Sequence, residues 1–575
     1  MDKNDLQNFF KKRMVELLDK HTLDSYRVRT NNLMTILKEL SYVLDSWVNG
    51  NVKRLETVEL CISECIDLLK DDTLENRELF ISALEDYLSK SRNKKDEPLI
   101  EDTIKMKFWT DELFEINQDR YLVYLIGNIE GVLFDDKEYD EESFIPALKS
   151  LDKLISAFAC ELLRIGYSKV YLYRYFKALL KNRQGNTFQD SFNGMKEKFS
   201  NREKIHFTVV ISLEFGSKKA AINANHIEEL KNEIPNNLRD IANLQNEIKN
   251  PMGNFKFFCE EIEDLDAHSA SVKVNDNLQK ILDFQQEHII NLKPHYGAVV
   301  IQEKGGHYII TKESFNILDT GAEFMKEEIA TLQQKLRTLN DSEYVDKDVK
   351  DRLSASLRHL RIGDSQADID QQFINYWIAL EFIFASSSRN DNTYKRIKEN
   401  LVRIMTTCYI KRNILYIKNW CEKKNLLNNE EDILEKIKND DFLNSVNDKL
   451  LWYRLKNLKS HVREESSIKE YIKAHSINLL RHLSRIYRLR NELVHEAAIK
   501  QDIVNVTSNL RFYLVFVINQ MVGYFSDNDQ YIKRKSMLSF FWTYEKYEAS
   551  IAKTNGVDNK LKVIDNVKIF KSCII

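Results

Sequence analysis

Proline is absent from the last 281 residues of this 575-residue chain. All five prolines lie between Pro98 and Pro294, and none follows Pro294. Proline removes a backbone donor and breaks the interior of a helix, so a long stretch without it favours long, uninterrupted helices. Glycine, the next strongest helix breaker, is also scarce, at 15 residues. A hydrophobic content of 43% is enough for substantial cores, and the length predicts more than one domain.

We therefore predict a mainly α, multidomain protein with a small central α/β unit and a C-terminal helical bundle. Apolar residues at helical spacing predict a helical N-terminal region over 1–202. The pattern changes after about residue 203, which predicts a small mixed α/β domain over 203–317. A helical domain over 318–530 follows. The last region, 531–575, holds nine Lys/Arg against four Asp/Glu. This basic tail either contacts RNA or is a solvated end, and we favour the solvated end.

The central unit is defined by short runs rich in β-branched and aromatic residues. We predict strands over His206–Phe215, Asn254–Cys259 and Ala270–Val274, and a hairpin that joins Ala298–Gln302 to His307–Thr311. Two glycines at 305 and 306 lie between the hairpin strands, as a tight turn requires. Helices are predicted over Ile227–Ile248 and Asn277–Ile290, and the charged segment Ser89–Pro98 is predicted to be a linker.

The candidate active site begins with the segment RLRNELVHE, residues 488–496. An arginine can neutralise the charge that builds up on a phosphate in a transition state, which suits Arg490. An imidazole can move the proton of a ribose 2′-hydroxyl near neutral pH, which suits His495. On one regular helix the two side chains would lie about 140° apart. Asn491 is a preferred N-cap residue, so we predict that one helix ends near Leu489 and another begins at Asn491, which would bring Arg490 toward His495.

A basic stripe precedes this motif. Arg481, Arg485 and Arg488 follow one another at i, i+4 and i+7, on one face of a helix. Residues 451–500 hold eleven Lys/Arg against five Glu, whereas the whole chain has a net charge of −3. A local basic stripe beside the motif is typical of a surface that binds a polyanion such as RNA. The alternative is an ordinary solvated helix face.

An earlier segment, FINYWIALEFIF over 373–384, supplies a candidate acid. Four apolar residues at 373, 377, 380 and 384 share one helix face, and Glu381 lies at the edge of that face. A carboxylate buried there must be paired or hydrogen-bonded. Glu381 is therefore either an acid that faces Arg490 and His495, or a structural partner of an arginine.

These two segments, which are well separated in the sequence, resemble the HEPN superfamily and, more narrowly, the Apea-like HEPN proteins of bacterial anti-phage defence. The resemblance covers roughly residues 320–530. It implies an all-helical domain that pairs two copies, with the Arg and His of both copies lining one cleft. It also implies metal-independent endoribonuclease chemistry that leaves a 2′,3′-cyclic phosphate. Arg490 and His495 match the family's defining pair, Asn491 matches the polar residue after the Arg, and Glu381 matches the acid of the upstream helix.

The resemblance leads us to expect an RNA endonuclease of abortive infection, with RNA, for example tRNA, as substrate and a homodimer as the assembly. The part of the chain that precedes the C-terminal helical domain is then expected to sense a phage-derived trigger or to restrain the nuclease. A different class of function stays open: a non-catalytic HEPN-type module that binds RNA or a protein and regulates a partner.

Composition limits the other possibilities. The seven cysteines are odd in number and mostly scattered, which does not indicate a disulfide framework. Cys61 and Cys65 lie one helical turn apart, but a zinc site would need two more ligands, so we predict no metal. We find no nucleotide-binding fingerprint and expect no cofactor. The longest apolar run, at 512–522, is too short and too polar to span a bilayer, and no signal peptide is seen, so we expect a cytoplasmic protein without a membrane segment.

Overall fold

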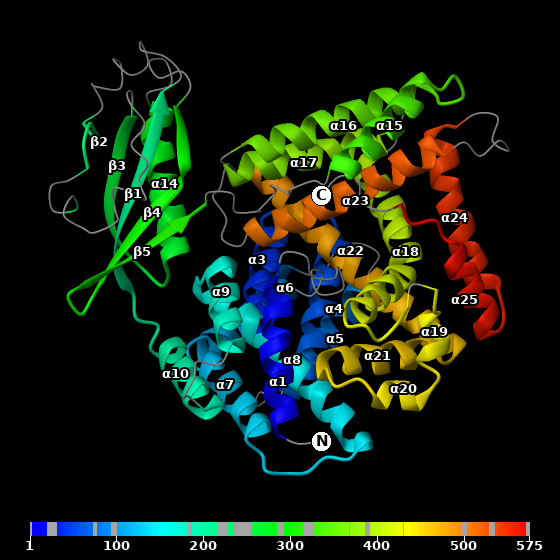
Figure 1. Cartoon of the computed structure of the whole chain (residues 1–575), viewed down its shortest axis with the longest axis horizontal. Coiled ribbons are helices and arrows are strands. Elements are labelled where there is room, and N and C mark those ends of the chain that lie inside the picture. Colours follow the sequence, from blue (N-terminus) through cyan, green and yellow to red (C-terminus); the bar gives the residue numbers. More distant parts are fainter. Residues whose placement is uncertain are drawn as a thin grey trace.

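Helices make up most of the molecule, and one small antiparallel sheet forms a lobe beside them (Figure 1). The computed structural model describes residues 3–19, 31–72, 77–93, 100–181, 187–215, 228–234, 238, 255–284, 292–314, 326–366, 368–385, 392–428, 430–495, 503–527 and 535–570. The predicted fold class, mainly α and multidomain with a small central α/β unit, is confirmed. None of the described helices is both long enough and apolar enough to cross a membrane.

The N-terminal region is helical, as predicted. Its helices are α1 (Lys3–Leu18), α3 (Leu33–Val48), α4 (Leu55–Asp71), α5 (Arg77–Asn93), α6 (Ile100–Asn117), α7 (Tyr121–Leu133), α8 (Glu141–Ile165), α9 (Lys169–Leu180) and α10 (Phe188–Asn201). Helix α3 begins in a capping box between Asn32 and Thr35, and Asn32 also donates a 2.9 Å hydrogen bond to the buried Glu161 of α8. The side-chain cap therefore fixes both the start of α3 and its position on α8.

The central unit is a five-stranded antiparallel sheet of order β2-β3-β1-β4-β5. Its strands are β1 (Ile205–Phe215), β2 (Leu230–Lys231), β3 (Phe255–Asp264), β4 (Leu292–Lys304) and β5 (His307–Glu313), and its helix is α14 (Ala267–Phe284). Alternate residues of β1 pack against α14, as the period of a strand requires. The predicted hairpin is confirmed: β4 and β5 meet at Gly305 and Gly306, whose positive φ values of 59° and 77° match a primed two-residue turn.

Residues Ala270–Val274, predicted as a strand, are helical, and that prediction is wrong. They lie in α14, where Ala270, Val274 and Leu278 recur at every fourth position and are buried against the sheet. The spacing of the buried side chains outweighed the local preference of two valines for strand. The predicted helix over Ile227–Ile248 includes the short strand β2, and most of its other residues lie outside the described part of the chain. Residues 94–98 of the predicted linker lie outside it as well, and residues 89–93 end helix α5.

Long helices build the C-terminal part, as the absence of proline predicts. They are α15 (Lys326–Asp341), α16 (Lys347–Ser365), α17 (Ile369–Phe384), α18 (Thr393–Lys423), α19 (Ile433–Lys436), α20 (Asp440–Asn444), α21 (Lys449–Val462), α22 (Glu465–His495), α23 (Ile503–Ser526), α24 (Met537–Lys553) and α25 (Val557–Asn566). A core of buried apolar side chains joins α16, α17, the first half of α18, the second half of α22, α23 and α24. This core carries the candidate motif.

Residues 417–462 do not pack in this C-terminal core. The end of α18 and helices α19 to α21 share one apolar core with α1 to α10. Helix α18 is unbroken over its 31 residues, so it runs from one core into the other. The predicted domain over 318–530 is therefore divided between two cores, because apolar spacing shows that a helix is buried but not which partner buries it.

The predicted solvated tail is wrong for most of its length. Residues 537–566 form α24 and α25, and Phe540, Phe541 and Tyr544 of α24 are buried in the C-terminal core. Residues 571–575 lie outside the described part of the chain. Lys546, Lys553 and Lys562 are exposed on these two helices, whereas Lys560 is buried, and the charge count alone does not distinguish this arrangement from a free end.

Candidate functional site

The motif lies at the end of α22, and the structure corrects the predicted helix break. Helix α22 continues through Asn491 to His495, so Asn491 is an interior residue and not an N-cap. Arg490 and His495 therefore leave one continuous helix about 140° apart. The side chain of His495 lies outside the described part of the chain, so the structure locates this residue only by its backbone, as the last residue of α22.

Arg490 and Glu381 are brought together across two helices. Nη2 of Arg490 lies 3.6 Å from Oε1 of Glu381 on α17. The indole Nε1 of the buried Trp377, one turn earlier on α17, donates a 2.6 Å hydrogen bond to the same oxygen. Nη1 of Arg490 donates to the side-chain oxygen of Asn491 at 3.3 Å. Three of the predicted site residues thus form one connected group, and Trp377 fixes the carboxylate within it.

This group is accessible from solvent. The side chain of Arg490 is 27% exposed and that of Glu381 is 34% exposed. The single contact of 3.6 Å is loose, whereas Arg511 makes a two-pronged contact of 2.8 and 3.0 Å with Asp364 nearby. A guanidinium held loosely by one carboxylate keeps free N–H donors, which can turn to an incoming phosphate.

An aromatic group flanks the site, and the sequence prediction missed it. Tyr487, one turn before Arg490, lies 5.9 Å from the Trp377 ring and stacks on Tyr394 at 3.9 Å. The guanidinium of Arg54, from the N-terminal region, covers both tyrosines at 4.6 and 5.2 Å. The spacing of Tyr487 three residues before Arg490 was the signal in the sequence, since residues at i and i+3 share a helix face.

The other histidines of α22 and its neighbours have structural roles. His482 is buried, and its Nδ1 lies 2.9 Å from the hydroxyl of Tyr513. Burial, with the positive charge of Arg485 nearby, lowers the pKa of His482 to about 3, so it stays neutral at physiological pH. His475 and His461 stack on Tyr409 and Tyr471. His482 is thus unsuited to proton transfer near neutral pH, because an effective catalytic pKa lies close to the working pH.

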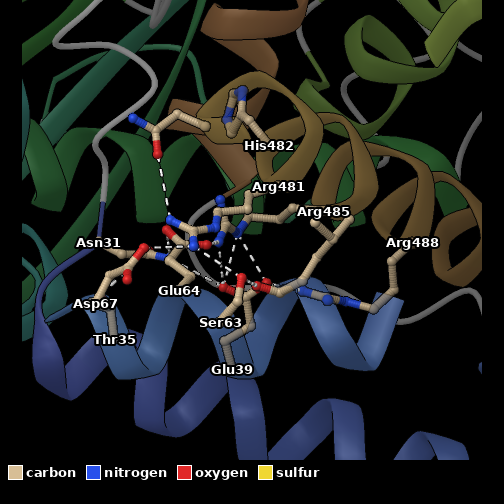
Figure 2. A network of polar contacts seen from close by, with 12 residues as sticks. Asn31, Thr35, Glu39, Ser63, Glu64, Asp67, Arg481, His482, Arg485 and Arg488 are labelled. Atoms are coloured by element: carbon tan, nitrogen blue, oxygen red, sulfur yellow. Dashed lines mark hydrogen bonds and ion pairs between the residues drawn. The ribbon is translucent and has the colours of Figure 1, made fainter. Parts of the chain in front are cut away.

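The basic stripe faces the N-terminal region and not the solvent. Arg481, Arg485 and Arg488, which we call the arginine stripe, point from α22 onto α3 and α4 (Figure 2). Their side chains are only 9%, 11% and 13% exposed. The sequence interpretation of a solvated face is wrong for these residues, and in this arrangement they are closed to RNA as well. Their predicted role in RNA binding stays a prediction, and it requires a different arrangement of the chain.

Carboxylates from α3 and α4 pair with each member of the stripe. Arg485 donates through Nε to Glu39 at 2.9 Å and through Nη2 to Glu64 at 2.9 Å. Nη2 of Arg488 donates to Oε1 of Glu39 at 2.5 Å, so one carboxylate serves two arginines. Arg481 donates through Nη2 to Asp67 at 2.6 Å and to the hydroxyl of Ser63 at 2.9 Å.

The electrostatics of this network are dominated by the ion pairs. Burial by itself would raise the pKa of Glu39, but the guanidiniums of Arg485 and Arg488 outweigh it and lower the pKa to about 2. Burial would lower the pKa of Arg485, and the carboxylates of Glu39 and Glu64 raise it instead. These groups are therefore charged at neutral pH.

No family model, curated protein or solved structure matches the chain in comparisons of sequence and fold. Within the described ranges, no group of three or more His, Cys, Asp or Glu side chains is placed to hold a metal ion.

Proposed function

We propose that the chain is an endoribonuclease of the HEPN type that acts in defence against phage. The observation that supports the proposal is the contact between Arg490 and Glu381. It joins, in one partly exposed group, the two sequence segments on which the resemblance rests. RNA, for example tRNA, is the proposed substrate, the cytoplasm the proposed location, and a phage-derived trigger the proposed signal.

The proposed chemistry is attack of a ribose 2′-hydroxyl on the adjacent phosphate. The 2′-oxygen forms a bond to phosphorus as it loses its proton to a base, and the 5′-oxygen leaves with a proton from an acid. His495 serves as base or acid, Arg490 neutralises the charge on the five-coordinate phosphate, and Glu381 positions Arg490. Asn491 restrains the guanidinium through its side-chain oxygen. The products are a 2′,3′-cyclic phosphate and a 5′-hydroxyl, with no metal in the reaction.

The continuous α22 bears on how many copies a site needs. One regular helix directs Arg490 and His495 about 140° apart, so a single copy does not present both on one face. A cleft between two copies would supply an arginine from one and a histidine from the other. The homodimer implied by the resemblance therefore fits the helix geometry better than a site within one copy.

Induced expression with and without phage challenge, with total RNA analysed beside growth, tests this proposal. Wild type is expected to fragment RNA, and Arg490→Ala or His495→Ala to reduce fragmentation by about 100-fold or more. Arg361→Ala, which removes an exposed arginine from α16, is the matched control and should behave as wild type. Intact RNA in all strains, with phage protection retained, would favour the non-catalytic binding module instead.

A further inference from the structure

The arginine stripe and Arg490 lie on opposite faces of one helix, about 140–180° apart. The backbone position of His495, seven residues after Arg488, returns to the face of α22 that carries the stripe. The guanidinium groups that would extend an RNA-binding surface from the position of His495 along α22 are all engaged by Glu39, Glu64 and Asp67, which we call the acidic lock. The guanidinium donors that form bidentate hydrogen bonds with a carboxylate also form them with a phosphate.

Charge complementarity between the two regions extends beyond the acidic lock. Helix α4 carries five acidic residues and one basic residue. Elsewhere, Lys398 pairs with Glu56 of α4, and Arg454 and Lys456 of α21 pair with Glu16 and Glu141. Acidic side chains of the first helices thus pair with basic side chains of α18, α21 and α22, although α21 itself shares the core of α1 to α10.

Stability alone does not account for this concentration of charge. A buried ion pair must overcome a large desolvation penalty, and well-packed apolar residues often stabilise a protein as well or better. The network is also open at one end. The side chain of Asp67 is 62% exposed, while Glu39 and Glu64 are 13% and 12% exposed. A competing phosphate can thus begin at Arg481 and continue toward Arg485.

We propose that the acidic lock occupies the phosphate-binding positions of the arginine stripe, so that α22 binds the RNA backbone along its length only after α3 and α4 move away from it. This inference rests on the proposed function for the identity of the polyanion. It assigns the N-terminal region a mechanism of restraint: its carboxylates take the place of RNA phosphates. A trigger that binds or displaces α3 and α4 would expose the stripe on the face of α22 that also carries position 495.

The test measures RNA binding by the full chain carrying His495→Ala, so that RNA is not consumed. A fluorescein-labelled 20-nucleotide single-stranded RNA is titrated with this chain and with the same chain carrying Glu39→Gln, Glu64→Gln and Asp67→Asn. Neutralising the lock is expected to tighten binding at least tenfold at 50 mM salt. The slope of log affinity against log salt should steepen by about 2, as three new phosphate contacts require.

A matched control has the same change in net charge. Glu16→Gln, Glu56→Gln and Glu141→Gln remove three other carboxylates of the first helices, which pair with cations of α18 and α21 and not with the stripe. This control should bind RNA no more than about twofold more tightly than the parent. Equal tightening in both triple variants would overturn the lock, because net charge would then explain the gain. So would unchanged binding in the lock variant.

A single substitution covers the case in which the triple variant does not fold. Asp67→Asn removes only the exposed end of the lock and should tighten binding about twofold to threefold. Its control is Asp71→Asn on the same helix, where the carboxylate pairs with Lys153 and not with the stripe. Equal affinity of the two variants would contradict the lock.

The acidic lock and the proposed nuclease activity can fail independently of each other. With His495 restored, tighter binding by the lock variant without cleavage would keep the lock and reject the nuclease. Cleavage by wild type with no gain in binding on unlocking would keep the nuclease and reject the lock.

Discussion

At the scale of single residues, the site depends on how Glu381 is held. Trp377 donates a hydrogen bond to Oε1 of this carboxylate, and Arg490 forms an ion pair with the same oxygen. The sequence was sufficient to predict that Glu381 lies at the edge of an apolar face, because helical spacing determines which side chains share a face, but it left open whether Glu381 faces Arg490 or pairs with another arginine. It was not sufficient to predict Trp377 as the donor, because spacing does not reveal which way an indole turns.

Glu381→Gln separates the charge of this residue from its hydrogen bond. A glutamine oxygen still accepts from Trp377, so we expect the free energy of unfolding to change by less than about 1 kcal/mol. The ion pair with Arg490 is lost, and we expect kcat for RNA cleavage to fall about tenfold. Glu548→Gln, which removes an exposed partner of Arg403, is the control and should keep full activity. Unchanged kcat in Glu381→Gln would rule out a positioning role.

Asp370 gives a residue-scale prediction about pH. Burial, reinforced by the charges of Asp368 and Asp276, raises the pKa of Asp370 from 3.8 to about 6. A carboxyl whose pKa is raised in the folded state is more easily ionised in the unfolded chain. Asp370 therefore lowers the free energy of unfolding progressively as pH rises from about 4 to about 6. Asp370→Asn should therefore stabilise the protein at pH 7.5, by on the order of 1 kcal/mol after solvent screening. Thermal unfolding should show a smaller gain at pH 5, and a gain independent of pH would contradict the assignment.

At the scale of elements, the apolar pattern predicted α17 correctly, but the local propensities misled in two places. The valines of α14 favoured a strand, and Asn491 favoured a helix start. In both cases a neighbouring element decided the outcome, because buried positions at helical spacing outweigh the preference of a single residue. The bounds of an element are set by what it packs against, which a local pattern does not contain.

The contact between α16 and α17 gives an element-scale prediction. Gly363 of α16 lies so close to the Tyr376 ring of α17 that an added Cβ would be 2.5 Å from its Cε1 atom. Gly363→Ala should force the helices apart and destabilise the protein by about 1–3 kcal/mol in chemical denaturation. Gly194→Ala in α10 is the matched control, since its added Cβ meets nothing within 4 Å. The control should stabilise by up to about 1 kcal/mol, and a neutral result at Gly363 would contradict close packing there.

At the scale of the whole molecule, two cores are joined by α18 and by the network between α22 and helices α3 and α4. The sequence did not reveal this arrangement. Glu39 and Arg485 lie in opposite halves of the sequence, and a stripe of arginines has the same pattern whether solvent, RNA or a distant carboxylate faces it. The count of basic residues in segment 451–500 was correct, but the groups that pair with the arginine stripe are determined by the tertiary fold.

The acidic lock also predicts how stability depends on pH. Glu39 has its pKa lowered to about 2 from an ordinary value of 4.5, so its contribution to stability is complete above about pH 4.5 and is lost as pH falls toward 2. Glu39→Gln leaves two buried arginines short of a partner and should destabilise the protein by about 3–5 kcal/mol at pH 7. The difference from wild type should shrink as pH is lowered through this window. A difference that grows toward low pH would contradict the ion pairing.

The central claim is RNA cleavage by the motif on α22, and one experiment tests it most directly. Purified full-length protein is incubated with end-labelled single-stranded RNA in EDTA, as wild type and as the Glu39→Gln, Glu64→Gln, Asp67→Asn variant, each with and without His495→Ala. We predict fragments with 2′,3′-cyclic phosphate ends in the chains that keep His495, faster in the unlocked one, and intact RNA in both His495→Ala chains. Intact RNA in all four samples, or equal cleavage with and without His495, would contradict the account.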